Sequence, residues 1–236
     1  MTVIERRWLA AMFAIILTVI GVSGCTGTEP VDMNRTITLT LVRHGQSEGN
    51  RSGRMDTTVP GPALTDLGTA QALMIANRLS GNGYDGVFAS TMVRTQQTAE
   101  PMAQRRGGVV TAIQGLQEIE AGNFEGKPEA SAAKTYYGHI IHWTTGDRGA
   151  RIPGSIDGNE FDDRFDRAIE EIYATGDSHP IAYSHGAAIA AWATMNAENP
   201  RPDLMKTAPL PNTGYVVLTG KPDNWKLVDW NGTEVS

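Results

Sequence analysis

Apolar and β-branched positions divide the chain after residue 35 into alternating strands and helices. The run 36–43 is β-branched and predicts a buried strand, and the apolar segments 86–89 and 180–184 predict two more. Between them, apolar residues recur at helical spacing in 66–79 and from Phe161 to Ile172. This alternation is typical of an α/β fold with a mostly parallel sheet.

The remaining elements are less regular. Ser90 or Thr91 is expected to cap a helix that carries Arg94 in its first turn, and Asn159 is expected to cap another. The other predicted elements are a strand at 109–113, helices at 128–143 and 187–196, and strands at 214–219 and 225–230, the last two antiparallel.

The first 24 residues have the pattern of an export signal. A charged start is followed by an apolar run from Trp8 to Val22, which is shorter than the roughly 20 residues of a membrane span. Val22-Ser23-Gly24-Cys25 then resembles a bacterial lipobox, in which Cys25 is lipidated and becomes the mature N-terminus. Residues 1–24 are then the lipoprotein signal peptide that is removed. The alternative is an ordinary signal peptide whose nearby cysteine is incidental.

Cysteine usage favours lipidation. Cys25 is the only cysteine, so the chain has neither a disulfide framework nor a thiolate metal site, whereas a lipid attachment point accounts for it. Two or more acyl chains, such as palmitate, hold a protein stably on a bilayer. Residues 25–35 then form a polar tether, and the protein is expected on the extracytoplasmic face of the cell membrane.

Charge and length restrict the rest of the chain. Residues 36–236 are long enough for one α/β domain. The net charge is −6, and −7 without residues 1–24, which argues against nucleic acid as a partner. An anionic ligand therefore needs a local positive pocket.

Such a pocket is predicted where the first strand ends, at Arg43-His44-Gly45. Ligands of α/β sheets bind at the carboxyl ends of the strands. An arginine offers a planar fork of donors to phosphate oxygens, and a histidine ring nitrogen is able to attack phosphorus. Glycine allows the backbone to turn sharply beside a ligand.

Further motifs follow in a fixed order. They are Asn50 six residues after the histidine, Leu64-Thr65-x-x-Gly68-x-x-Gln71-Ala72, Ala89-Ser90-x-x-x-Arg94-Thr95-x-Gln97-Thr98-Ala99, Leu116-x-Glu118 with Gly122 and Phe124-Glu125-Gly126, and Ser184-His185-Gly186. Together they resemble the histidine phosphatase superfamily, the phosphoglycerate-mutase-like proteins. The resemblance implies a three-layer αβα sandwich, with a lid or insert at about 118–158.

It also implies roles for the site residues. His44 is expected to become phosphorylated, with His185 opposite it across the phosphate, and Arg43, Asn50 and Arg94 are expected to bind the phosphate. Phosphoryl transfer requires mainly that the group be positioned and its charge stabilised. Helices that begin after Gly186 and near Thr91 are expected to direct backbone N–H groups at the same anion. Glu118 is the expected general acid, with Glu120 and Glu125 as competitors.

The favoured function is hydrolysis of small phosphomonoesters by a membrane-anchored phosphatase of the histidine acid phosphatase type. The reaction is expected to pass through a phosphohistidine and to need neither a metal nor a cofactor. One alternative is phosphoglycerate-mutase-type phosphoryl transfer. Those mutases place two arginines after the tryptophan that matches Trp143, where this chain has Thr144-Thr145, although Arg148 or Arg151 remains as a substitute. The other is a lipoprotein that binds a phosphate ligand without turnover.

One motif is interpreted as structural. Leu210-Pro211-Asn212-Thr213-Gly214 spells a sorting signal, but neither a hydrophobic span nor a basic tail follows it. We interpret it as a turn before a strand.

Overall fold

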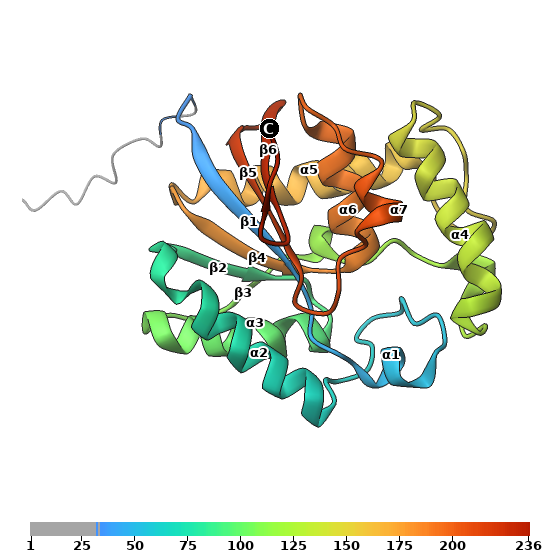
Figure 1. Cartoon of the computed structure of the whole chain (residues 1–236), viewed down its shortest axis with the longest axis horizontal. Helices are drawn as coiled ribbons and strands as arrows, with labels where there is room; N and C mark the ends of the chain where they lie inside the picture. The colour runs from blue at the N-terminus through green and yellow to red at the C-terminus, as the bar shows by residue number, and fades with distance from the viewer. Residues whose placement is uncertain (1–31, 33) are drawn as a thin grey trace, which may run out of the picture. The chain divides into compact units, whose positions relative to one another are not determined.

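The computed structural model describes residue 32 and residues 34–236, and a seven-stranded sheet lies at their centre (Figure 1). The strands stand in the order β3-β2-β4-β1-β5-β6-β7. Their bounds are β1 Ile37–Arg43, β2 Gly86–Ala89, β3 Thr111–Ala112, β4 Pro180–Ser184, β5 Tyr215–Lys221, β6 Asn224–Trp230 and β7 Thr233–Glu234. Neighbouring strands from β3 to β1 are parallel, and β5, β6 and β7 continue the sheet by antiparallel pairing.

Helices cover both faces of the sheet, as the three-layer sandwich requires. Figure 1 shows α2 and α3 on one side and α5 and α6 on the other. The helices are α1 Glu48–Ser52, α2 Asp66–Leu79, α3 Val93–Arg106, α4 Glu129–Thr144, α5 Gly158–Ala174, α6 Gly186–Asn196 and α7 Leu204–Thr207, with short 3-10 turns at Ser80–Asn82, Gln114–Leu116 and Gly122–Phe124.

The sheet separates two hydrophobic cores. Ile37, Leu39 and Leu41 of β1 pack into the core beneath α5 and α6, whereas Val42 belongs to the core beneath α2 and α3. This follows from the strand repeat of two residues, which sends successive side chains to opposite faces. The predicted α/β sandwich is therefore confirmed.

Two predicted helix caps are wrong. α5 begins at Gly158 because Asp157, and not Asn159, is its N-cap: the Asp157 carboxylate accepts from the backbone of Asn159 and Glu160, and the Glu160 carboxylate accepts from Asp157 N–H. α3 begins at Val93 behind Met92, which makes no side-chain cap bond. The hydroxyl of Ser90 lies within hydrogen-bond distance of His185 Nε2.

The short elements escaped the sequence pattern. α1, α7 and β7 were not predicted, and β3 has two residues where a strand over 109–113 was expected. The predicted signal segment 1–24, Cys25 and most of the tether lie outside the described residues, so these boundaries stay predictions. Within the described part of the chain, no helix is long and apolar enough to cross a membrane.

Candidate active site

Two histidines meet where β1 and β4 end. The strands are parallel neighbours, with Arg43 paired to Ser184, so His44 and His185 leave the sheet side by side. Both are buried, and their ring centroids lie 5.2 Å apart at an interplanar angle of 63°. The carboxyl ends of parallel strands thus bring together residues 141 positions apart, as this class of sheet does for its ligand sites.

A cleft of about 480 Å³ opens beside these rings, and we call it the central cleft. Of the six residues predicted for the site, five line it directly, and the sixth, His185, contacts the ring of His44. The lining of the central cleft includes charged, polar and aromatic side chains: Arg43, His44, Asn50, Asp56, Arg94, Glu118, Glu129, Tyr136 and Tyr137.

His44 has a nucleophilic nitrogen fixed by its neighbours. Its Nδ1 lies 2.7 Å from the carbonyl oxygen of Gly45, which only accepts, so Nδ1 carries the hydrogen and Nε2 keeps a lone pair. Nε of Arg94 donates to that Nε2 at 3.1 Å. Burial first, and then the charges of Arg94 and Arg43, hold the pKa of His44 well below its usual value. The ring is therefore neutral and able to attack.

His185 is held by a residue that the sequence pattern had assigned to a helix cap. Ser90 Oγ lies 2.9 Å from Nε2 of His185, and the Thr95 hydroxyl lies 2.8 Å from Ser90 Oγ. Burial and the charge of Arg94 hold the pKa of His185 well below its usual value, which favours a neutral ring.

Three buried nitrogens of the site have no hydrogen-bond partner among the described residues: His185 Nδ1, Arg43 Nε and Arg94 Nη1. The two guanidiniums are otherwise anchored, since Arg43 Nη1 donates to the Leu210 carbonyl at 2.6 Å and Arg94 Nη2 to the Asp56 carbonyl at 3.3 Å. Buried donors in proteins are almost always paired. Arg43 and Arg94 both line the central cleft, so their guanidiniums are suited to bind an oxyanion with several acceptor oxygens.

Glu118 lines the same cleft and caps α6. Its carboxylate accepts from the backbone N–H of Ile119 and Ala188, both at 2.9 Å, and from Ala187 at 3.4 Å. Glu118 therefore occupies the N–H groups of Ala187 and Ala188, two of the α6 amides that were expected to point at the bound anion. The α3 amide of Val93 is also taken, by the Pro60 carbonyl at 3.0 Å.

The electrostatics of Glu118 suit a proton donor. Burial raises the pKa of the carboxyl, and the backbone hydrogen bonds and Arg94 offset part of that rise. The two competitors do not line the cleft. Glu125 accepts from N–H and Oγ1 of Thr57, and Glu120 lies 3.8 Å from Arg164.

Asn212, in the segment interpreted as a plain turn, orients the cleft. Its Nδ2 donates to the His44 carbonyl and to Oδ1 of Asn50, both at 3.2 Å. Asn50 Oδ1 also accepts from Ser47 N–H at 3.1 Å, so the oxygen of Asn50 is occupied and its amide nitrogen is left as a donor. The local sequence around Leu210 and Asn212 does not predict that this segment lies close to the cleft.

Several motif residues hold the site without entering it. A Cβ on Gly45 would lie 2.6 Å from the Gly68 carbonyl, and one on Gly68 would lie 2.0 Å from the Gln46 carbonyl, so both glycines are required by close backbone approach. Thr98 Oγ1 accepts from Gly45 N–H at 3.0 Å, and Gln71 Oε1 accepts from Gln46 N–H at 2.8 Å.

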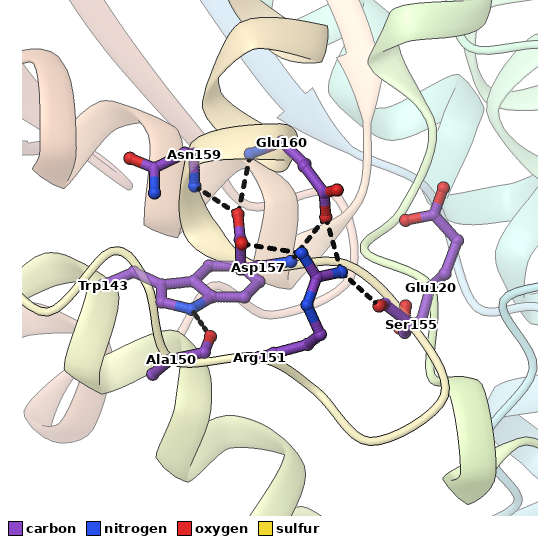
Figure 2. A network of polar contacts seen from close by, with 8 residues as sticks. All are labelled: Glu120, Trp143, Ala150, Arg151, Ser155, Asp157, Asn159 and Glu160. Carbon is purple, nitrogen blue, oxygen red and sulfur yellow. Dashed lines mark hydrogen bonds and ion pairs between the residues drawn. The ribbon is translucent and has the colours of Figure 1, made fainter.

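The segment predicted as a lid supplies part of the cleft wall. Glu129, Tyr136 and Tyr137 of α4 line it. Trp143 does not: it is buried, stacked on Phe161 at 5.7 Å, and donates to the Ala150 carbonyl (Figure 2).

The two arginines considered as carboxylate clamps are engaged elsewhere. Figure 2 shows Arg151 between Asp157 and Glu160, at 2.8 Å from each carboxylate, where it ties the loop before α5 to the helix start. Arg148 pairs with Asp162 and donates to the Met195 carbonyl. Neither lines the central cleft.

Residues 39–233 match the family model of the histidine phosphatase superfamily (branch 1). The PE-PGRS family protein PE_PGRS11 of Mycobacterium tuberculosis is 42% identical over 218 residues, which cover 85% of this chain and 37% of that protein. A Yersinia pestis protein named "Probable phosphoglycerate mutase GpmB" is 31% identical over 150 residues, 63% of this chain and 69% of that protein. The chain therefore spans little more than a third of the first relative's length.

Solved structures share the fold. "Mycobacterial hydrolase 1" has a TM-score of 0.70 at 24% identity and covers 85% of this chain and 100% of its own. A mycobacterial glucosyl-3-phosphoglycerate phosphatase has a TM-score of 0.69 at 23% identity, over 84% of this chain and 100% of its own. A phosphoserine phosphatase from Entamoeba histolytica has a TM-score of 0.66 at 23% identity, over 83% and 96%. At these identities the likeness is one of fold.

Proposed function

The chain belongs to the histidine phosphatase superfamily (branch 1), and we propose that it hydrolyses small phosphomonoesters through a phosphohistidine at His44. The observation that best supports this proposal is that Arg43, Arg94 and Glu118 line one cleft together with a neutral His44, whose Nε2 carries a lone pair, while His185 lies against the His44 ring. A phosphate group offers acceptor oxygens to the two guanidiniums and an electrophilic phosphorus to His44 Nε2.

In the first step, His44 Nε2 forms a bond to phosphorus while the bond from phosphorus to the ester oxygen breaks. The carboxyl of Glu118 gives its proton to that oxygen, and the alcohol leaves. In the second step, water attacks phosphorus, its proton passes to the Glu118 carboxylate, and the bond to Nε2 breaks. Inorganic phosphate leaves, and Arg43, Arg94, His185 and Asn50 stabilise the charge on the phosphoryl oxygens throughout.

Hydrolysis of p-nitrophenyl phosphate by the wild type and by His44→Ala, with and without a chelator, tests the proposal. We expect turnover that the chelator does not change and that falls by about 10⁴-fold or more in the variant, because the attacking atom is lost. His179→Ala removes an exposed histidine and is the matched control. Tight phosphate binding without turnover would instead favour a binding protein.

Mutase activity is the second candidate because of the Yersinia pestis relative. Arg148 and Arg151, the candidate carboxylate clamps, are bound to Asp162 and to Asp157 and Glu160, which favours transfer to water over return to a bound acid. Interconversion of 2- and 3-phosphoglycerate that depends on a bisphosphorylated primer would establish the mutase instead.

We also propose that the protein is exported and anchored on the extracytoplasmic membrane face through lipid on Cys25. The support is the order of charged, apolar and small residues before a single cysteine. Labelled palmitate supplied to bacterial cells that express the full chain is expected to appear in the wild type and to be absent from Cys25→Ser. Equal labelling of both would contradict the anchor.

A further inference from the structure

A second cavity adjoins the central cleft, and we call it the side cavity. Both are lined by Arg43, Glu118, Glu129 and Tyr137, and the side cavity encloses about 800 Å³, part of it open to solvent. If Glu118 protonates the ester oxygen, the leaving alcohol must lie beside Glu118. Because Glu118 lines both spaces, an alcohol that lies beside Glu118 is next to the side cavity.

The far wall of the side cavity is apolar. It is made of Ala187 and Ala190 of α6, Met205 of α7, and Pro209 and Leu210. The charged groups that line the cavity are the shared Arg43, Glu118 and Glu129. Apolar surface of this kind stabilises the apolar part of a ligand by removing it from water.

Glu129 is the carboxylate left available to a ligand at the junction. Glu118 is engaged by three backbone N–H groups, whereas Glu129 accepts one long hydrogen bond, from the Tyr137 hydroxyl at 3.3 Å. In the described part of the chain Glu129 has no ion pair. Arg43 is turned to the Leu210 carbonyl and belongs to the phosphate site.

An aromatic side chain and a free carboxylate next to each other are the two groups that recognise an organic ammonium ion. Tyr137 and Glu129 supply them where the central cleft meets the side cavity. A carboxylate on the leaving group would instead face Glu129 as a like charge, and like charges disfavour binding.

We propose that the side cavity is a leaving-group subsite for alcohols with an ammonium group and apolar substituents, and that Glu129 determines this specificity. This inference rests on the proposed hydrolysis. It predicts that phosphocholine is a better substrate than 3-phosphoglycerate.

The values of kcat/KM for phosphocholine, 3-phosphoglycerate and p-nitrophenyl phosphate in the wild type, Glu129→Gln and Glu100→Gln test the inference. In the wild type we expect kcat/KM for phosphocholine to exceed that for 3-phosphoglycerate about tenfold or more. In Glu129→Gln we expect this ratio to fall about tenfold, because the negative charge is removed. The value for p-nitrophenyl phosphate, an ester without an ammonium group, is the reference in each variant, so the expected loss is one in the ratio of the phosphocholine value to this value. Glu100→Gln, on the exposed face of α3, should behave as the wild type.

A second variant tests the location. Ala190→Phe fills the side cavity from α6, so we expect kcat/KM for phosphocholine to fall while the inhibition constant of inorganic phosphate is unchanged. A wild-type preference for 3-phosphoglycerate, a ratio unaltered by Glu129→Gln, or an unaffected Ala190→Phe would overturn the inference and leave phosphate hydrolysis standing. Hydrolysis of no ester would overturn the proposed function and this inference with it.

Discussion

In several site residues, a hydrogen bond to one side-chain atom determines which other atom of that side chain is available to a ligand. Gly45 fixes the hydrogen of His44 on Nδ1, which leaves the lone pair on Nε2, and Ser90 contacts Nε2 of His185. Asn50 behaves similarly, because its oxygen is occupied by Ser47 and Asn212. The chemistry of the cleft therefore depends on residues outside it.

Replacing Asn212 tests this dependence. Asn212→Ala removes the donors to the His44 carbonyl and to Asn50 Oδ1, so the Asn50 amide loses its fixed orientation. We expect kcat/KM to fall about tenfold or more, since a lost buried hydrogen bond costs about 1–3 kcal/mol. Asn77→Ala on the exposed face of α2 is the control. Equal kinetics in the two variants would show that Asn212 has no positioning role.

Replacing Glu118 tests its role as the acid. Glu118→Gln retains an oxygen for the α6 amides but has no proton to give. We expect hydrolysis of an alkyl phosphate to fall by about 10²–10⁴-fold, the usual contribution of a general acid. p-Nitrophenyl phosphate should lose much less, because nitrophenolate leaves without protonation. The same loss for both esters would contradict this assignment.

At the scale of elements, periodicity located the long pieces and missed the ends. α2, β2 and β4 lie at their predicted bounds, although α2 buries Ala72, Ile75, Ala76 and Leu79 and leaves the apolar Leu67 and Met74 exposed. Asp157 was passed over as a cap because the sequence before α5 contains two capping residues, and only the capping box with Glu160 selects between them. Ser90 resembled a cap, but its hydroxyl is used by a histidine 95 residues away.

The contact between the loop after β1 and the start of α2 is a strict backbone fit. A methyl group on Gly68 would lie 2.0 Å from the Gln46 carbonyl, so Gly68→Ala must push the two segments apart. We expect a loss of unfolding free energy of about 3 kcal/mol or more, measured by denaturant titration. Gly81→Ala places the same methyl group in open space and should change stability by less than about 1 kcal/mol. Equal losses would contradict the proposed fit.

For the whole molecule, the parallel strand ends explain what could be predicted of the site. Arg43, His44 and His185 follow predictable strands, so their meeting was expected from the fold class and from the family resemblance. The position of Asn212 and the side cavity were not expected. Both depend on the path of residues 204–214 over α6 and the cleft. The capping of α6 by Glu118 was missed for the same reason: it joins segments about 70 residues apart.

Burial of His44 also couples the fold to pH. Its pKa in the folded protein lies well below the value of about 6.5 in an unfolded chain, so below that pH the unfolded chain binds a proton that the folded protein does not. Stability is therefore lost as the pH falls, at up to about 1.4 kcal/mol per pH unit for this group.

Between about pH 7 and about pH 5.5, we expect His44→Gln to lose less unfolding free energy than the wild type, because the proton uptake by residue 44 on unfolding is removed. Denaturant unfolding at each pH measures this difference. Other titrating groups, among them Asp166, whose pKa is raised to about 6 by burial, are common to both proteins and cancel in the comparison. His179→Gln, at an exposed position, should keep the wild-type response. If His44→Gln keeps it as well, His44 is not held neutral by the fold.

The most direct measurement is rapid quenching of the full chain with a ³²P-labelled phosphomonoester, followed by identification of the labelled peptide. Formation of a covalent bond to His44 Nε2 predicts an acid-labile, base-stable label on the peptide that contains His44, and none in His44→Ala. Turnover of the ester with no label on the protein, or with the label on a different residue, would contradict nucleophilic attack by His44.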